Sequence, residues 1–312
     1  MSAVLVTGGA GFIGSHIADA YLALGHEVVV VDNLSRGNRA NVPDGAEFVQ
    51  ADIRDPSVAD LIRDRRFEVI NHHAAQVDVR VSVADPRFDA SINLDGLLNL
   101  LEAARNHGVG RFLFVSSGGV VYGEPAVRPT PETEPKLPAS PYGVTKLTGE
   151  QYLYYYNRVH GLDYAALRYS NVYGPRQDPH GEAGVVAIFS TRLIDGDPLT
   201  VFGDGEQTRD YVYVGDVVAA NMLLTHADLG PARTLDDRAF NVGTGVETSV
   251  NDLAESLARA SGRPLEIRRA PARDGELLHS SLDASKLRGL GWAPATGLGA
   301  GLGLTFDWIA AR

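Results

Sequence analysis

The chain has 312 residues, of which 44% are hydrophobic, with a formal net charge of −11 and no cysteine. This acidity disfavours nucleic acid and anionic membranes as partners, and the lack of cysteine excludes disulfides and thiolate metal sites. No basic stretch precedes the short apolar run at the N-terminus, and no apolar run approaches the roughly 18 residues of a membrane span. We therefore expect no signal peptide, no membrane segment and no metal, and the cytoplasm is the simplest compartment.

The first half of the chain alternates between strand-like and helix-like segments, a pattern that predicts parallel βαβ units. Strands are expected at 3–6, 28–31, 47–50, 67–71 and 111–115, and helices at 17–24, 58–65 and 93–107. The proline-rich stretch 125–141 predicts an irregular surface loop, because proline cannot donate a backbone hydrogen bond.

The second half begins with a long helical pattern at 142–160 and a strand at 163–168. Beyond Tyr169, regular patterns return as helices at 212–226 and 250–261, a strand at 239–242 and a closing amphipathic segment that ends at Arg312. The sequence thus predicts an α/β fold, with a Rossmann-type doubly wound parallel sheet and a smaller α/β C-terminal substrate domain. We expect residues 1–170 to form the first domain, joined by segments near 211–243, and residues 171–312 to form most of the second.

A glycine-rich turn with Gly8, Gly11 and Gly14 joins the first strand to the first helix. Such a turn lets the backbone approach a pyrophosphate and directs helix N–H groups at it, although glycines also open ordinary α/β turns. Asp32 ends the second strand 18 residues after Gly14, close to the ~20 residues expected for the acid that binds a ribose hydroxyl. A carboxylate there would repel a 2′-phosphate, so the pattern favours NAD over NADP; Arg36, which could hold that phosphate, argues the other way.

Tyr142 and Lys146 lie one helical turn apart on the same face of the expected helix 142–160. A tyrosine acts as a general base near neutral pH only if its anion is stabilised, and Lys146 and an oxidised nicotinamide would both supply positive charge. The same spacing occurs in solvated surface pairs. Here it begins a helix that follows a strand ending in Ser116 and Ser117, which favours a catalytic role.

Further motifs run through the whole chain. They are Asp32-Asn33-Leu34-Ser35, Asp52-Ile53, Ala74-Ala75, Asn93-x-x-Gly96, Val121-Tyr122-Gly123, Arg168-Tyr169-Ser170-Asn171-Val172-Tyr173-Gly174-Pro175, Val201-Phe202-Gly203-Asp204-Gly205, Thr208-Arg209-Asp210-Tyr211-Val212 and Asp283-Ala284-Ser285-Lys286. With these motifs and the two described above, the chain resembles the extended short-chain dehydrogenase/reductase family, and within it the UDP-glucose 4-epimerases.

The resemblance implies NAD as the cofactor and a UDP-sugar as the substrate. By position, the NAD site would comprise Gly8, Gly11, Phe12, Ile13, Gly14, Asp32, Asn33, Ser35, Arg36, Asp52, Ile53, Ala74, Ala75, Asn93, Ser116, Tyr142, Lys146 and Tyr169. The substrate site would comprise Ser117, Tyr142, Asn171, Val185, Thr200, Phe202, Gln207, Arg209, Arg273, Glu276 and Ser280. The two arginines could neutralise a diphosphate on this otherwise acidic protein, and Phe202 could stack on uracil.

The chain departs from the family at Gly118, where a Ser or Thr usually donates a hydroxyl beside the tyrosine. Ser117 is the nearest substitute, because the two glycines that follow it let the backbone reposition it. Alternatively, Ser116 and Ser117 only end a strand. On the first interpretation the catalytic residues are Tyr142, Lys146 and Ser117.

The implied reaction is epimerisation at C4 of a UDP-hexose, through a transient 4-keto sugar. A 4,6-dehydratase would carry an Asp-Glu pair where this chain has Gly119 and Val120, which disfavours that alternative. A UDP-glucuronate epimerase or decarboxylase, and a non-catalytic NAD-sensing protein, stay open. The small Ser280 leaves room for N-acetylated sugars, and the helices near 93–107 and 142–160 are expected to form a homodimer interface, as in similar enzymes.

Overall fold

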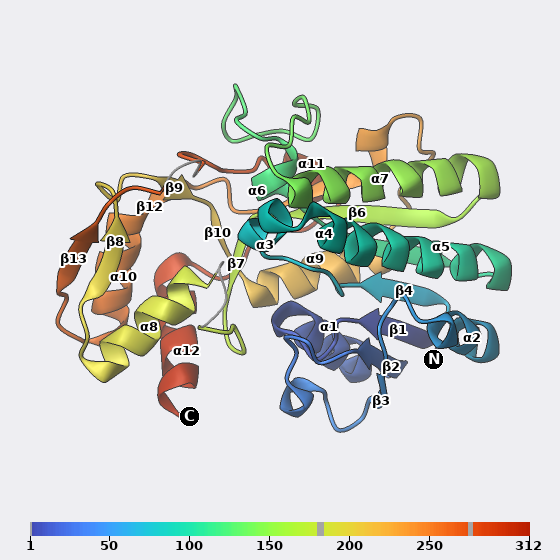
Figure 1. Cartoon of the computed structure of the whole chain (residues 1–312), viewed down its shortest axis with the longest axis horizontal. Coiled ribbons are helices and arrows are strands. Elements are labelled where there is room, and N and C mark those ends of the chain that lie inside the picture. Colours follow the sequence, from blue (N-terminus) through green and yellow to red (C-terminus); the bar gives the residue numbers. More distant parts are fainter. Residues whose placement is uncertain (1, 180–183, 274–276) are drawn as a thin grey trace.

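The computed structural model describes residues 2–179, 184–273 and 277–312. Its centre is a seven-stranded parallel sheet in the order β11-β6-β5-β4-β1-β2-β3 (Figure 1). The strands are β1 (Ala3–Thr7), β2 (Glu27–Asp32), β3 (Glu47–Gln50), β4 (Val69–His72), β5 (Arg111–Ser117), β6 (Asp163–Tyr169) and β11 (Ala239–Val242). Strand order reverses between β1 and β4, and at such a point doubly wound sheets bind ligands beyond the carboxyl ends of their strands. The predicted Rossmann-type fold is confirmed.

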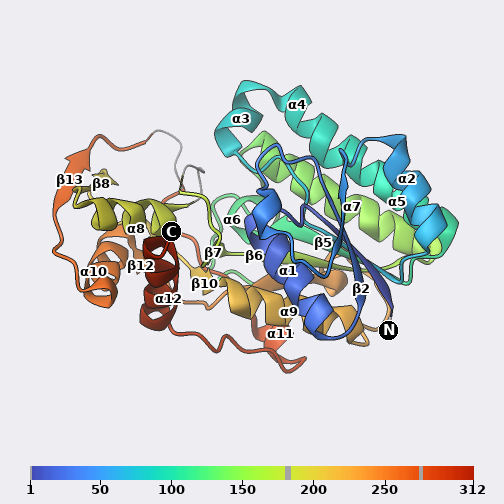
Figure 2. The same ribbon diagram turned by 90° about the horizontal axis from the view of Figure 1, so that it is seen from below.

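Helices cover both faces of this sheet (Figure 2). They are α1 (Phe12–Ala23), α2 (Pro56–Arg65), α3 (Val79–Ala84), α4 (Pro86–Ala90), the π-helical η2 (Ser91–Asp95), α5 (Gly96–His107), α6 (Gly118–Val121), α7 (Pro141–His160) and α9 (Val214–His226), with short 3₁₀ turns η1 (Arg39–Asn41) and η3 (Leu235–Arg238).

The strands read as continuous apolar runs because both faces of the sheet are buried. In β2, Val28 and Val30 pack in the cluster that contains α1 and α9. Val29 and Val31 point to the opposite face and pack with side chains of α2, α5 and α7.

A smaller region follows, drawn at the left of Figure 1. It contains α8 (Val185–Asp195), α10 (Val250–Ser261), α12 (Leu298–Ala310) and three two-stranded sheets, which pair β7 (Asn171–Tyr173) with β10 (Tyr211–Tyr213), β8 (Leu199–Phe202) with β13 (Ile267–Ala270), and β9 (Thr208–Arg209) with β12 (Thr248–Ser249). The short helix α11 (Ser285–Arg288) returns beside β11. Side chains from α8, α10 and α12 share one apolar core, separate from the cores of the large sheet.

Several local expectations need correction. The helix expected from residue 212 begins at Val214, because Tyr211–Tyr213 pairs with β7. The helix expected from residue 93 begins inside η2, and α5 itself begins at Gly96; α4, η2 and α5 follow one another without a break, since the residues at their junctions keep helical backbone angles. The short helices α3, α4 and α6 were not expected from the sequence. Among the described residues, no helix is long and apolar enough to span a membrane.

Candidate active site

The glycine-rich turn between β1 and α1 is packed so tightly that two of its glycines admit no side chain. Gly8 has a φ of +70°, and a Cβ there would lie 2.6 Å from the backbone nitrogen of Ala74. A Cβ on Gly14 would lie 2.3 Å from the Gly8 carbonyl oxygen, whereas one on Gly11 would meet nothing nearer than 3.1 Å. Gly11 is the N-cap of α1 and no side chain caps the helix, so its first N–H groups suit an anion such as a pyrophosphate. Phe12 and Ile13 form the first turn of this helix.

Asp32 stands at the end of β2 beside this turn. Its carboxylate accepts hydrogen bonds from the backbone N–H groups of Ala10, at 3.1 Å, and Leu34, at 2.8 Å. Arg36, which could have favoured a 2′-phosphate, instead has its guanidinium 3.5 Å from the carboxylate of Asp78. The buried carboxylate and the paired arginine together fit a ribose hydroxyl better than a phosphate.

A second acidic side chain, Asp52, follows β3. Asn33 donates a hydrogen bond to it at 3.0 Å, and Arg54 holds it through two bonds of 2.8 Å. The hydrogen bonds from Arg54 hold the pKa of Asp52 well below its usual range. Ile53 is buried against Gly96, while the Ser35 N–H donates to Asn33 and orders the turn after β2.

The loop after β4 carries Ala74 and Ala75, and the Ala74 N–H donates to the Thr7 hydroxyl at 3.3 Å. Asn93 anchors the same loop, because its side chain accepts from the Gln76 N–H at 2.9 Å and donates to the Gln76 carbonyl at 3.0 Å. Asn93 is 5% exposed, so its contribution here is to fix the loop.

Tyr169 ends β6, and its hydroxyl accepts a hydrogen bond of 2.7 Å from Asn221 in α9. Its ring centroid lies 6.4 Å from that of His73, which follows β4. This contact joins the carboxyl ends of β6 and β4, at the end of the sheet where the other predicted NAD-site residues lie.

Tyr142 and Lys146 lie in the first turns of α7, which begins where the Ser140 hydroxyl accepts from the Gly143 N–H at 3.1 Å. The Lys146 ammonium donates to the Val115 carbonyl at 2.9 Å and lies 5.7 Å from the centroid of the Tyr142 ring. Burial lowers the pKa of Lys146 to about 8, against the opposing effect of nearby carboxylates.

Burial raises the pKa of Tyr142, and the Asp89 carboxylate raises it further. The lowered Tyr142 pKa that we expected from the sequence is therefore not produced by Lys146 alone. It requires a second positive charge near the phenol, such as an oxidised nicotinamide.

Ser116 and Ser117 end β5, and their hydroxyls differ in burial and hydrogen bonding. Ser116 is 1% exposed and donates a 2.6 Å hydrogen bond to Glu150. Ser117 is the N-cap of α6 but makes no capping bond, and its hydroxyl has no hydrogen bond to any other described residue. A Cβ on Gly118 would lie 2.5 Å from Leu282 Cδ1. Leu282 therefore fills the space that a Ser or Thr side chain at position 118 would need.

Apart from Ser117 and Tyr142, the predicted substrate residues that the structure describes lie in the smaller region. Gln207 donates to the Phe202 carbonyl at 3.1 Å, and the Arg273 guanidinium lies 3.9 Å from the centroid of the Phe202 ring. Arg209 donates to the Thr208 carbonyl at 2.8 Å, and the same carbonyl accepts from the Ser280 N–H at 3.3 Å. Asn171 begins β7, Thr200 lies in β8 and Val185 begins α8, while Glu276 lies outside the described residues.

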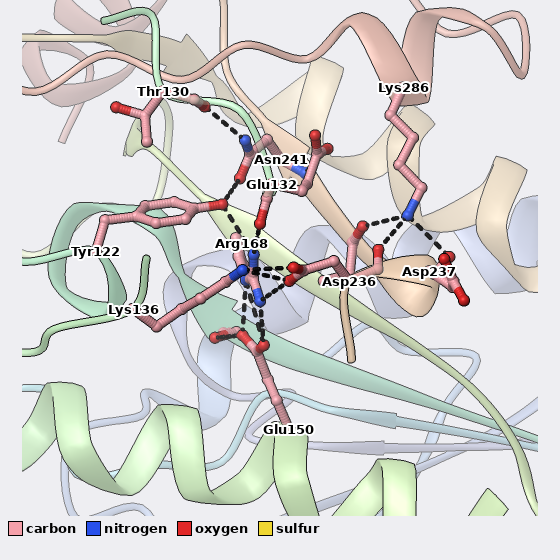
Figure 3. A network of polar contacts seen from close by, with 12 residues as sticks. Tyr122, Thr130, Glu132, Lys136, Glu150, Arg168, Asp236, Asp237, Asn241 and Lys286 are labelled. Atoms are coloured by element: carbon pink, nitrogen blue, oxygen red, sulfur yellow. Dashed lines mark hydrogen bonds and ion pairs between the residues drawn. The ribbon is translucent and has the colours of Figure 1, made fainter. Parts of the chain in front are cut away.

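Glu150, which accepts the Ser116 hydrogen bond, belongs to a buried ionic network that was not predicted from the sequence (Figure 3). Arg168 in β6 is fully buried and donates to Glu150 in α7, with Nη2 at 2.6 Å and Nε at 3.0 Å. Arg168 also donates to the Tyr122 hydroxyl at 2.9 Å, and Tyr122 donates to Asn241 at 2.7 Å. Glu150 lies one helical turn after Lys146, a spacing that could have placed it on the same face of the helix.

The sheet, its glycine turn and the tyrosine–lysine pair with its buried ammonium define a dinucleotide-binding α/β enzyme. The chain belongs to the NAD dependent epimerase/dehydratase family, whose model matches residues 4–243.

Relatives match over nearly the whole chain. A UDP-glucose 4-epimerase of Mycolicibacterium smegmatis is 48% identical over 98% of this chain and 97% of its own. The structure of a UDP-glucose 4-epimerase from Thermotoga maritima with UDP-glucose is 46% identical, covers 99% of each chain and has a TM-score of 0.94. That of a Thermus thermophilus UDP-glucose 4-epimerase complex with NAD is 47% identical, covers 98% of each chain and has a TM-score of 0.91.

Proposed function

We propose that this protein is a cytoplasmic enzyme that interconverts UDP-glucose and UDP-galactose with bound NAD. The observation that carries the proposal is the Tyr142–Lys146 pair at the start of α7, with a half-buried phenol and a buried ammonium that donates to the Val115 carbonyl in β5. The family membership and the full-length similarity to UDP-glucose 4-epimerases support it.

The residues that would hold NAD are those of the glycine turn, with Asp32 at a ribose hydroxyl. When bound, NAD accepts a hydride from C4 of the sugar and returns it to the opposite face of that carbon. The Lys146 ammonium stabilises the Tyr142 phenolate, which takes the proton of the C4 hydroxyl; the resulting phenol gives that proton back when the hydride returns. Arg209 and Arg273 hold the diphosphate, which leaves the 4-keto sugar free to turn between the two transfers.

The direct test is to incubate purified protein with UDP-galactose, without added NAD, and to measure UDP-glucose. We expect conversion with no net NADH, because the cofactor is regenerated in each cycle. Release of a 4-keto-6-deoxy sugar would indicate a dehydratase, turnover of UDP-glucuronate alone would indicate an enzyme of uronic acids, and NAD binding without turnover would indicate a sensor.

We propose that Ser117 supplies the hydroxyl missing at Gly118. Ser117→Ala should lower kcat by roughly ten- to a thousand-fold, the effect of losing one transition-state hydrogen bond. Ser116→Ala is the matched control and should lower kcat much less, because Ser116 is turned toward Glu150. Equal and mild effects on kcat would mean that the site works without a serine hydroxyl.

We propose that the pocket accepts N-acetylated sugars because residue 280 is small. Ser280 is buried, and its backbone is held against Thr208. Ser280→Tyr should lower kcat/KM for UDP-N-acetylgalactosamine much more than for UDP-galactose, since a tyrosine would occupy the space that the acetamido group needs. If the wild type rejects the acetylated sugar, or if the variant discriminates no better, Ser280 does not control this choice.

We also propose a homodimer built from α5 and α7. Val144, Tyr155 and Val159 lie on one side of α7 and are 48%, 47% and 59% exposed, and an apolar groove lined by Leu94, Pro138 and Val144 adjoins them. Sedimentation should give twice the 33.4 kDa mass of one chain. Val144→Asp should shift the protein toward monomer, whereas Leu304→Asp, equally exposed but on α12, should not. A wild-type monomer at micromolar concentration would rule the dimer out.

A further inference from the structure

Asp89 is a fully buried carboxylate in α4 that none of the roles above uses. Helix α4 lies against the first turns of α7, where Tyr142 and Lys146 are located (Figure 2). We propose that Asp89 is a positioning residue for this pair: it fixes the start of α7 through Thr145 and places a buried carboxylate beside the helical turn that carries Lys146. This inference rests on the proposed function, because it assigns Asp89 a part in the same reaction.

Three side chains donate hydrogen bonds to Asp89. Thr145 donates to Oδ2 at 2.8 Å, while Gln76 and Asn93 donate to Oδ1 at 2.8 and 3.1 Å. All three donors are neutral, and no arginine or lysine forms an ion pair with Asp89 among the described residues. Hydrogen bonds of this kind replace the water that a buried carboxylate has lost, so Asp89 has its polar partners without a neutralising cation.

Thr145 connects this carboxylate to the catalytic helix. It lies between Tyr142 and Lys146 in the sequence, and its hydroxyl is 2.8 Å from Asp89 and 3.0 Å from the Tyr142 carbonyl. A second contact from the same side of α7 is the Tyr142 N–H, which donates to Ser82 in α3 at 3.2 Å. The first turn of α7 is thus attached to α3 and α4 as well as to the sheet.

The charged and titratable groups around Lys146 come from three elements. They are His72 and His73 at the end of β4, Tyr142 and Glu150 on α7, and Asp89 on α4. Burial, and then the charge of Lys146, lower the pKa of both histidines, so they stay neutral. The charge of Glu150 is already matched by Arg168. Asp89 is therefore the one carboxylate near Lys146, within the described chain, whose charge has no other cationic partner.

The Asp89 charge acts on both members of the pair: it raises the pKa of Tyr142, which opposes the phenolate, and it raises the pKa of Lys146, which preserves the ammonium that stabilises the phenolate. Burial lowers the pKa of Lys146, while Asp89 and Glu150 raise it, so removing the Asp89 charge should lower it further. A neutral Lys146 cannot stabilise the tyrosinate, so activity should then be lost at a lower pH on the alkaline side of the profile.

The test uses the fact that the chain contains only three lysines, Lys136, Lys146 and Lys286. Holoenzyme labelled with ε-¹³C-lysine gives three side-chain signals, and the Lys146 signal is assigned by its absence in Lys146→Met. In Asp89→Asn the titration midpoint of Lys146 should fall by roughly one pH unit, with Lys136 and Lys286 unchanged. At the wild-type midpoint the charged fraction would then fall from one half to about one tenth, so kcat should fall about fivefold there.

Two control variants separate charge from packing. Asp210→Asn removes another fully buried carboxylate, which accepts from the N–H groups of Thr244 and Leu282, and should leave the Lys146 midpoint unchanged. Thr145→Val removes a hydrogen bond but no charge, and should lower kcat without moving the midpoint.

The Lys146 midpoint is measured without substrate, so it tests Asp89 even if the protein proves not to be an epimerase. A folded Asp89→Asn that retains NAD and has an unchanged midpoint would overturn the proposal. If Asp89→Asn does not fold, Asp89→Ser, which leaves room for a water, is measured instead. Failure of both variants to fold would also overturn it, because the carboxylate would then be needed for the fold.

Discussion

Replacing Tyr142 by phenylalanine should lower kcat by at least roughly 10²–10⁴-fold, the contribution of a positioned general acid and base. The substitution removes only the oxygen that ionises. The Tyr142 hydroxyl forms no hydrogen bond with another described residue, so its loss should leave the fold and the retained NAD largely intact. Turnover of UDP-galactose, the NAD released on denaturation and the circular dichroism spectrum measure the three effects separately.

A matched control for this variant lies on the same helix. Tyr155 is 47% exposed, so Tyr155→Phe makes the same chemical change away from Lys146 and should leave kcat within about twofold. If Tyr142→Phe retains activity within about tenfold of the wild type, Tyr142 is not the acid and base, and another group must move the proton.

The fold could be predicted from the sequence where the signal is local. Continuous valines at 28–31 indicate a strand buried on both faces, and Gly161, which has a φ of +73°, ends α7 where the pattern predicts. The glycine turn was also predictable, because its spacing is a property of one short segment. Its physical reason, the contacts of Gly8 and Gly14 with backbone atoms, became visible only in three dimensions.

The site could be predicted less completely, because much of it depends on the direction of neighbouring side chains. Ser116 and Ser117 are adjacent in β5, and successive strand residues point to opposite faces. The sequence could not say which serine meets Glu150. Asp89 was missed for a related reason: its partners Gln76 and Thr145 are 13 and 56 residues away, in segments that only the fold brings together.

The Arg168–Glu150 pair was the least predictable feature, and it should have the largest effect on stability. Both side chains are almost fully buried, at 0% and 1% exposed, and Arg168 donates to the carboxylate through Nε and Nη2 (Figure 3). Glu150→Gln keeps the shape but removes the nearer of the two carboxylates that pair with the buried guanidinium, and among the described residues leaves only Asp236, at 3.2 Å. We expect the free energy of unfolding to fall by about 3–5 kcal/mol, the cost of removing one partner of a buried pair.

Urea unfolding of the NAD-loaded protein measures this loss, and an exposed pair provides the control. Arg259 and Glu255 in α10 lie 3.6 Å apart and are 70% and 59% exposed, so Glu255→Gln should change the stability by less than about 1 kcal/mol. If Glu150→Gln and Glu255→Gln are equally stable, the Glu150 charge does not contribute to the stability of the buried network.

A double variant then shows whether the Arg168–Glu150 pair itself stabilises the fold, or whether the loss in Glu150→Gln comes only from leaving Arg168 unpaired from Glu150. Arg168→Met with Glu150→Leu removes both charges, so it should be more stable than Glu150→Gln alone. The recovery should stay incomplete, because Tyr122 loses the 2.9 Å hydrogen bond from Arg168 and Ser116 the acceptor it has in Glu150. Since Ser116 precedes Ser117 in β5, a loss of kcat in the double variant beyond its loss of stability would indicate that the network also positions the end of this strand.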